Sequence, residues 1–174
     1  MTNIYEVREI GGKNLGCFAV QDINKGSTIL KEKSQLEVPQ TAQLFSLSNP
    51  ITPFLVQGLK EAFNKMTKAD QQEFMKLHDK YDDLSSLPPE LKLILQRKSE
   101  FVSKITKSDE NLAKIFKIYE TNAFGSGVGI KRSRFNHSCK PNAASAKVDD
   151  GPDSGHSLIV AVTNIKGNYF SRKK

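Results

Sequence analysis

Alternating apolar and polar positions open the chain. They predict three short strands within residues 1–44, at residues 4–10, 16–21 and 28–33. Glycine-containing segments separate these stretches, such as Asn24-Lys25-Gly26 between the second and the third, and such residues favour turns. We therefore expect small sheets in this part of the chain.

The pattern then becomes helical. Within residues 45–124, apolar positions recur at intervals of three and four, and Thr52-Pro53 has the cap-then-proline order of a helix start. Ser108 is placed to cap the last of these helices. Residues 125–167 return to loops and strands, with an apolar, β-branched run at 157–163. The order of strands, helical insert and strands predicts an α+β fold in a single domain over residues 1–174.

Composition places this domain among intracellular globular proteins. Apolar residues make up 37% of the 174 positions, which is enough for a core. No apolar run approaches the roughly 20 residues that span a bilayer, and the N-terminal residues lack a signal-peptide layout. The two cysteines make no disulfide framework. We expect a cytoplasmic and/or nuclear protein without a membrane segment.

The net charge of +7 adds little about function. Arg172, Lys173 and Lys174 supply three of these charges, and most of the others are lysines spread along helical stretches. Solvated helix faces explain such a distribution. Because no aromatic residues are interleaved with a basic motif, the sequence does not favour nucleic acid as a direct ligand.

The most informative segment surrounds a proline in the third zone. Its first residue, Asn136, has an amide that both donates and accepts hydrogen bonds, which suits the edge of a purine. Each residue by itself is an ordinary loop residue, but together they form a specific string: Asn136-His137-Ser138-Cys139-Lys140-Pro141-Asn142. This string resembles the Asn-His-Ser-Cys-x-Pro-Asn signature of SET-domain lysine methyltransferases.

A second segment supports that resemblance. Lys13-Asn14-Leu15-Gly16 is similar to the Lys-Gly-x-Gly opening of a SET domain, with Asn14 in place of the first glycine. A glycine there lets a ligand approach the backbone closely, although glycine turns between strands are common for other reasons. The resemblance implies binding of the cofactor S-adenosylmethionine by these and other residues: Lys13, Asn14, Leu15, Gly16, Asn122, Asn136 and His137.

A third segment, residues 119–124, resembles the Thr-Asn-Ala/Ser-Phe stretch that ends the helical insert of SMYD-type SET proteins. In that family the asparagine, here Asn122, lies near the cofactor. The alternative is a helix end with asparagine as terminator. SMYD proteins also carry a cysteine-rich MYND zinc module, and two cysteines are too few for one. Since a closed structural zinc site needs four ligands, we expect no metal.

The resemblance changes after Gly167. The family continues with Glu-Glu-(Ile/Leu), a short strand and a tyrosine that orients the lysine amine. Residues 168–174 are instead a basic tail, and Tyr169 stands at a different spacing. We therefore expect a C-terminally truncated SET fold in which no catalytic residue is assigned.

The resemblance implies methyl transfer from S-adenosylmethionine to a lysine of a protein substrate, weak or absent in this form. A non-catalytic SET-like remnant that binds a partner or the cofactor is the alternative. The sequence indicates neither the substrate protein nor the oligomeric state.

Overall fold

The computed structural model describes residues 3–10, 14–38, 53–81, 84–85, 87–124, 127–136, 138–148 and 155–167. The chain forms two compact units, each described separately. The sheet unit comprises Met1–Ser34 and Lys131–Lys174, and the helical unit comprises Gln35–Ile130. Both ends of the sequence are therefore needed to build the sheet unit.

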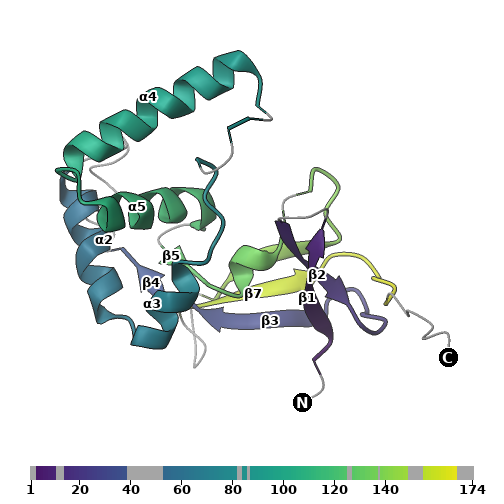
Figure 1. Ribbon diagram of the computed structural model, residues 1–174. Helices are drawn as coiled ribbons and strands as arrows, with labels where there is room; N and C mark the ends of the chain where they lie inside the picture. The colour runs from purple at the N-terminus through teal and green to yellow at the C-terminus, as the bar shows by residue number, and fades with distance from the viewer. Residues whose placement is uncertain are drawn as a thin grey trace, which may run out of the picture. The chain divides into compact units, whose positions relative to one another are not determined.

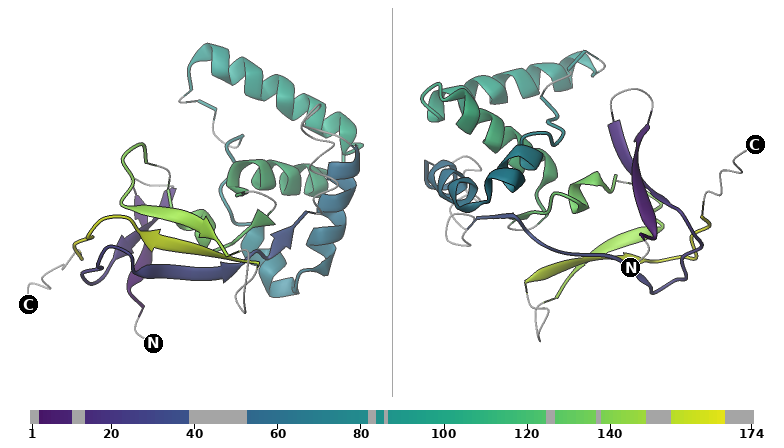
Figure 2. Two further views of the ribbon diagram at one scale, coloured as in Figure 1. Left: turned by 180° about the vertical axis from the view of Figure 1, so that it is seen from behind. Right: turned by 60° about the horizontal axis from the view of Figure 1, so that its bottom comes forward.

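The described residues of the sheet unit form two antiparallel sheets. Strands β1 (Tyr5–Ile10) and β2 (Asn14–Ala19) form a hairpin. Strands β3 (Thr28–Lys33), β7 (His156–Ala161) and β6 (Ala143–Lys147) form a second sheet with β7 in the middle, as Figure 2 shows. Alternate residues of β7 are buried, as expected of a strand with one face on a core. Apolar residues make that core: Ile23, Ile29, Leu30, Ile159 and Ala161.

In the part of the chain that the structure describes, the helical unit contains four helices and one short antiparallel strand pair, which Figure 1 labels. The helices are α2 (Pro53–Lys65), α3 (Lys68–Phe74), α4 (Pro89–Ile105) and α5 (Glu110–Asn122). The strands are β4 (Leu36–Glu37) and β5 (Gly127–Val128).

Helix α5 supplies the largest share of the buried side chains in this unit. Leu112, Ile115, Phe116, Ile118 and Tyr119 are all buried, at the spacing of an amphipathic helix whose apolar stripe is wide. Residues from α2, α3 and α4 complete the core, among them Leu59, Phe74 and Val102.

These elements confirm the predicted α+β class of small sheets and helices, with shifts at several boundaries. The second strand begins at Asn14, two positions before the predicted start at residue 16. The N-cap of α5 is Asp109, whose carboxylate accepts from Leu112 N at 3.0 Å, and not Ser108. Within the described residues no helix is long and apolar enough to cross a membrane.

Candidate functional site

Two of the motifs singled out in the sequence lie side by side in the sheet unit. Asn136 follows a 3-10 helix, η1 (Arg132–Arg134). Its Nδ2 donates a hydrogen bond to the main-chain oxygen of Leu15 on β2, at 3.1 Å, across 121 positions of sequence. The Asn136 side chain is exposed, whereas the neighbouring Gly16 is buried. The fold thus places an accessible carboxamide beside a glycine-containing strand.

A buried polar network fixes the turn that leads to Asn136. The Glu32 carboxylate on β3 accepts from Lys131 N at 3.0 Å and from Arg132 N at 2.9 Å. The Arg132 guanidinium donates through Nη1 to Ser157 Oγ on β7. Glu32 and Arg132 are only 7% and 3% exposed. Both groups are desolvated, and their opposite charges are screened less there than in water. The start of η1 is tied to two neighbouring strands.

Burial lowers the pKa of the Arg132 guanidinium, and the Glu32 charge acts in the opposite direction. Sequence reasoning did not identify either residue as part of the site. A signal was present: Glu32 stands two positions after the buried Leu30, on the same face of β3, so an acidic residue was placed where the strand faces inward.

Packing around the motif is aromatic and apolar. The rings of Tyr5 on β1 and Phe135 lie 5.3 Å apart, a favourable distance for an aromatic pair. Burial raises the pKa of the Cys17 thiol to about 12, with Arg134 acting in the opposite direction. Cys17 is therefore protonated near neutral pH and serves as a packing residue, because only the thiolate is a good nucleophile.

The chain after β7 lies against residues 21–23. Ile165 and Ile23 exchange two main-chain hydrogen bonds of 2.8 Å. The carboxylate of Asp22 accepts from Gly167 N at 3.0 Å and pairs with Lys166 Nζ at 2.7 Å. These two hydrogen bonds, Lys166 first, lower the pKa of Asp22. A Cβ at Gly167 would meet the Gln21 backbone at 2.6–2.9 Å, so this close approach requires glycine.

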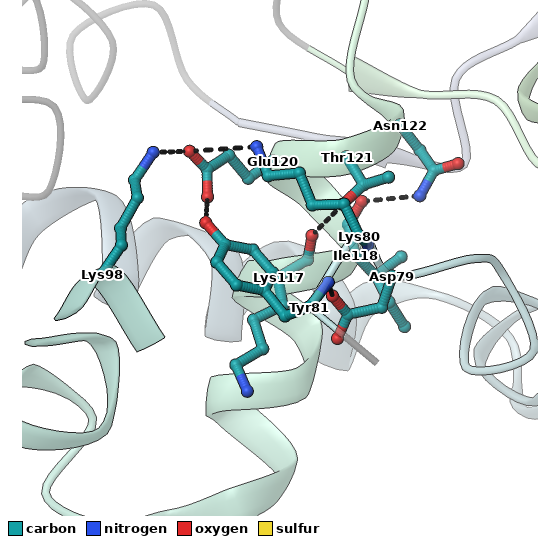
Figure 3. Close-up of polar contacts among 9 residues, drawn as sticks. All are labelled: Asp79, Lys80, Tyr81, Lys98, Lys117, Ile118, Glu120, Thr121 and Asn122. Atoms are coloured by element: carbon teal, nitrogen blue, oxygen red, sulfur yellow. Dashed lines mark hydrogen bonds and ion pairs between the residues drawn. The ribbon is translucent and has the colours of Figure 1, made fainter. Parts of the chain in front are cut away.

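The third motif, at the C-terminal end of α5, makes hydrogen bonds within the helical unit (Figure 3). Asn122 is buried, and its Nδ2 donates to His78 O and Ile118 O, both at 2.8 Å. Thr121 Oγ1 accepts from Lys80 N at 3.2 Å. The motif therefore anchors residues 78–80 to α5, which is in keeping with the alternative of a helix end closed by asparagine.

Glu120 extends this anchor to α4 (Figure 3). Its carboxylate accepts from the Tyr81 hydroxyl and from Lys98 Nζ of α4, and Lys80 Nζ lies 3.5 Å away. Burial raises the pKa of Tyr81 to about 12 and lowers that of Lys80. Lys117 Nζ lies 5.6 Å from the centre of the Tyr81 ring, within cation–π range. The Glu120 carboxylate of α5 thus joins this helix to α4 and to residues 80–81.

The remaining predicted site residues divide as follows. Lys13 and His137 lie outside the described residues. Asn14 is the first residue of β2 and pairs with Ile10, while Asn122 belongs to the helical unit. In the described part of the chain, no three His, Cys, Asp or Glu side chains are grouped so that they could hold a metal ion. The cofactor roles predicted for these residues stay predictions.

Comparison with known proteins gives one family and one fold. The family model of the SET domain matches residues 14–168. A similar solved structure is the crystal structure of the SET domain of LSMT bound to lysine and AdoHcy, with a TM-score of 0.58 and 14% sequence identity. The match covers 95% of this chain and 47% of that one, so the chain spans about half the length of that structure. No curated protein matches in sequence.

Proposed function

The chain belongs to the SET-domain family, and from this premise we propose that it transfers a methyl group from S-adenosylmethionine to a lysine side chain of a protein. The observation that carries the proposal is the hydrogen bond between Asn136 Nδ2 and Leu15 O, which joins two SET-like motifs in space. The solved structure that shares the fold was crystallised with AdoHcy and lysine, a cofactor product and an amine of the proposed classes.

The chemistry of these residues fits such a cofactor. With Nδ2 of Asn136 bound to Leu15, the Oδ1 atom of the same exposed amide is an acceptor that suits the exocyclic amino group of adenine. Gly16 has no side chain to block approach to the backbone of β2. We propose that Asn136 and residues 13–16 hold the cofactor together with His137.

The cofactor supplies an electrophilic methyl group on a sulfonium, so the protein's task is to prepare and align the amine. With a pKa near 10.4, only about 1 in 2,500 free lysines is neutral at pH 7, and reaching that form costs roughly 4–5 kcal/mol. Desolvation and a nearby cation both lower this cost, so a strong base is not required. In this chain, Glu32 and Arg132 hold the turn before Asn136 in place, which serves alignment.

Cofactor binding by residues 1–174 tests the proposal directly. We expect Asn136→Ala to weaken the binding of S-adenosylmethionine by about tenfold or more, which corresponds to loss of a well-placed hydrogen bond. The urea midpoint should fall no further than the loss of the single exposed hydrogen bond to Leu15 produces. Asn3→Ala, at an exposed asparagine that precedes β1, is the matched control. Titration calorimetry measures both. Equal affinity of the two variants would count against the assignment of Asn136.

We also propose a finer classification. The protein is SMYD-related and intracellular, and residues 1–174 by themselves transfer methyl groups slowly. The support is the motif at residues 119–124 and the change of pattern after Gly167. Residues 1–174 and a form continued after Gly167 by the family segment would each receive labelled S-adenosylmethionine and a lysine-rich protein. Equal methylation by both forms would contradict the expected role of that segment, and binding without transfer by both would support the non-catalytic alternative.

A further inference from the structure

A groove in the helical unit is lined by none of the motif residues 13–16, 119–124 and 136–142. It has a volume of about 690 Å³ and is formed by α2, the α3 region and the N-terminal half of α5. Its lining consists of apolar, basic and carboxamide side chains and one carboxylate. The lining residues are Lys60, Phe63, Asn64, Lys68, Gln71, Gln72, Met75, Lys76, Asp109, Asn111, Leu112 and Ile115.

The floor of the groove is apolar. Phe63 and Met75 are half-buried there, and Leu112 and Ile115 are buried. Phe63 is held by an edge-on contact with Phe74, with ring centres 5.7 Å apart. A concave apolar floor of this size accommodates one large apolar side chain of a partner, the kind of anchor that dominates binding at interfaces.

The rim is basic. Lys60, Lys68 and Lys76 line it, against the single carboxylate of Asp109. Lys76 is paired with Glu73 at 2.6 Å, and Asp109 accepts from Leu112 N at the start of α5. Lys68 Nζ donates to Gln71, which is neutral. With the charge of Lys76 offset by Glu73, the charges of Lys60 and Lys68 still exceed that of Asp109, and this positive excess favours an acidic partner.

The carboxamides favour a peptide over a fatty acid. Asn64, Gln72 and Asn111 both donate and accept hydrogen bonds, as a peptide main chain does. A fatty acyl chain would leave such groups without hydrogen bonds, which is costly when they are covered. A second copy of this chain would bring another net charge of +7, and like charges oppose association.

We propose that this groove binds an acidic peptide segment of a partner protein, anchored by one large apolar side chain on Phe63, Met75, Leu112 and Ile115. The site lies within the helical unit. The proposal goes beyond methyl transfer and does not depend on it, because it concerns binding alone.

The test is fluorescence anisotropy with residues 1–174 and a labelled peptide of Glu, Asp and Gly with one central Phe. We expect Lys60→Glu/Lys68→Glu to weaken binding by about tenfold or more, since both reversed charges face the peptide. Lys92→Glu/Lys104→Glu makes the same charge change on exposed residues of α4 that do not line the groove, and should change affinity less than about twofold. Replacing the Phe of the peptide by Ser should cost about tenfold or more.

Three results would overturn the proposal: no binding, equal weakening by the two double variants, or equal affinity of the Ser peptide. Tighter binding of a single-stranded oligonucleotide of the same charge, with displacement of the peptide, would assign the groove to nucleic acid instead. Circular dichroism checks that each variant is folded. Should Lys60→Glu/Lys68→Glu unfold, Lys60→Gln/Lys68→Gln removes the two charges without adding new repulsion and gives the same comparison.

Discussion

Glu32 is the residue on which the geometry before Asn136 depends. Its carboxylate accepts from two main-chain amides and lies near the buried guanidinium of Arg132. In Glu32→Gln, one accepting oxygen becomes an NH₂ group that faces an N–H, and the positive charge of Arg132 loses its compensation. We predict a loss of about 2–4 kcal/mol in the free energy of unfolding, measured by urea denaturation.

The control for this change is Glu9→Gln, on an exposed position of β1. A surface substitution of this kind should shift stability by no more than about 0.5 kcal/mol. Coincident unfolding curves for the two variants would show that the buried network contributes nothing beyond an exposed charge.

Gly167 is the second residue whose identity matters by itself. Its main chain lies so close to Gln21 that an added Cβ would be 2.6 Å from the carbonyl carbon of that residue. Backbone atoms cannot move aside as a flexible side chain can, so we predict that Gly167→Ala lowers the free energy of unfolding by about 1–3 kcal/mol.

Lys166→Ala separates this steric effect from the loss of the ion pair with Asp22. That pair is highly exposed, with 87% of the lysine side chain accessible, and such pairs contribute little to stability. Thermal denaturation of both variants distinguishes the steric effect from the loss of the ion pair. A smaller effect for Gly167→Ala than for Lys166→Ala would mean that the close approach is readily relieved.

At the scale of elements, the segment after β7 is held partly by a titratable group. In the folded protein, hydrogen bonds from Lys166 and Gly167 lower the pKa of Asp22 below its ordinary value of 3.8. The ionised form therefore stabilises the fold above about pH 4, and this contribution is lost as the pH falls through the lowered pKa. We predict that the urea midpoint of the wild type falls more steeply than that of Asp22→Asn as the pH is lowered below about 4. Parallel profiles would contradict this.

The helices show what apolar spacing in the sequence predicts and what it does not. Apolar spacing within residues 45–124 predicted helices, and α4, which contains Leu91, Ile94 and Val102, is one of them. Only Val102 of the three is buried, whereas Leu91 and Ile94 are 50% and 58% exposed. Periodicity indicates which residues share a face, but a face is buried only where another element packs on it. The cap of α5 was likewise missed by one residue, because Ser108 adopts a positive φ of 60° and Asp109 takes the extended conformation of an N-cap.

At the scale of the molecule, the helical unit has the features of an independently folding insert. Its core cluster draws only on residues between Leu36 and Val128. Its ends are also joined, because Gln35 N donates to Val128 O at 3.0 Å and Ile130 N to Gln35 Oε1 at 3.0 Å. A chain that enters and leaves at one place can be excised without breaking its core.

We predict that residues 35–130 expressed alone give a helical circular dichroism spectrum and a cooperative urea transition. Residues 1–34 expressed alone should stay unfolded, because β3 pairs with β7 near the other end of the chain and an isolated two-stranded hairpin is at best marginally stable. A random-coil spectrum for residues 35–130 would show that the insert needs the sheet unit in order to fold.

Local patterns in the sequence determined the element types, the α+β class and the motif that indicates a SET domain, because backbone propensity, apolar spacing and a specific residue string depend on neighbouring positions. Only the tertiary structure decided which distant residues meet. It joined Asn136 to Leu15, placed Glu32 against the Arg132 turn, and turned Asn122 toward His78. The physical reason is that hydrogen bonds and buried charges are satisfied by groups close in space, and the chain brings them together only when its strands pair and its helices pack.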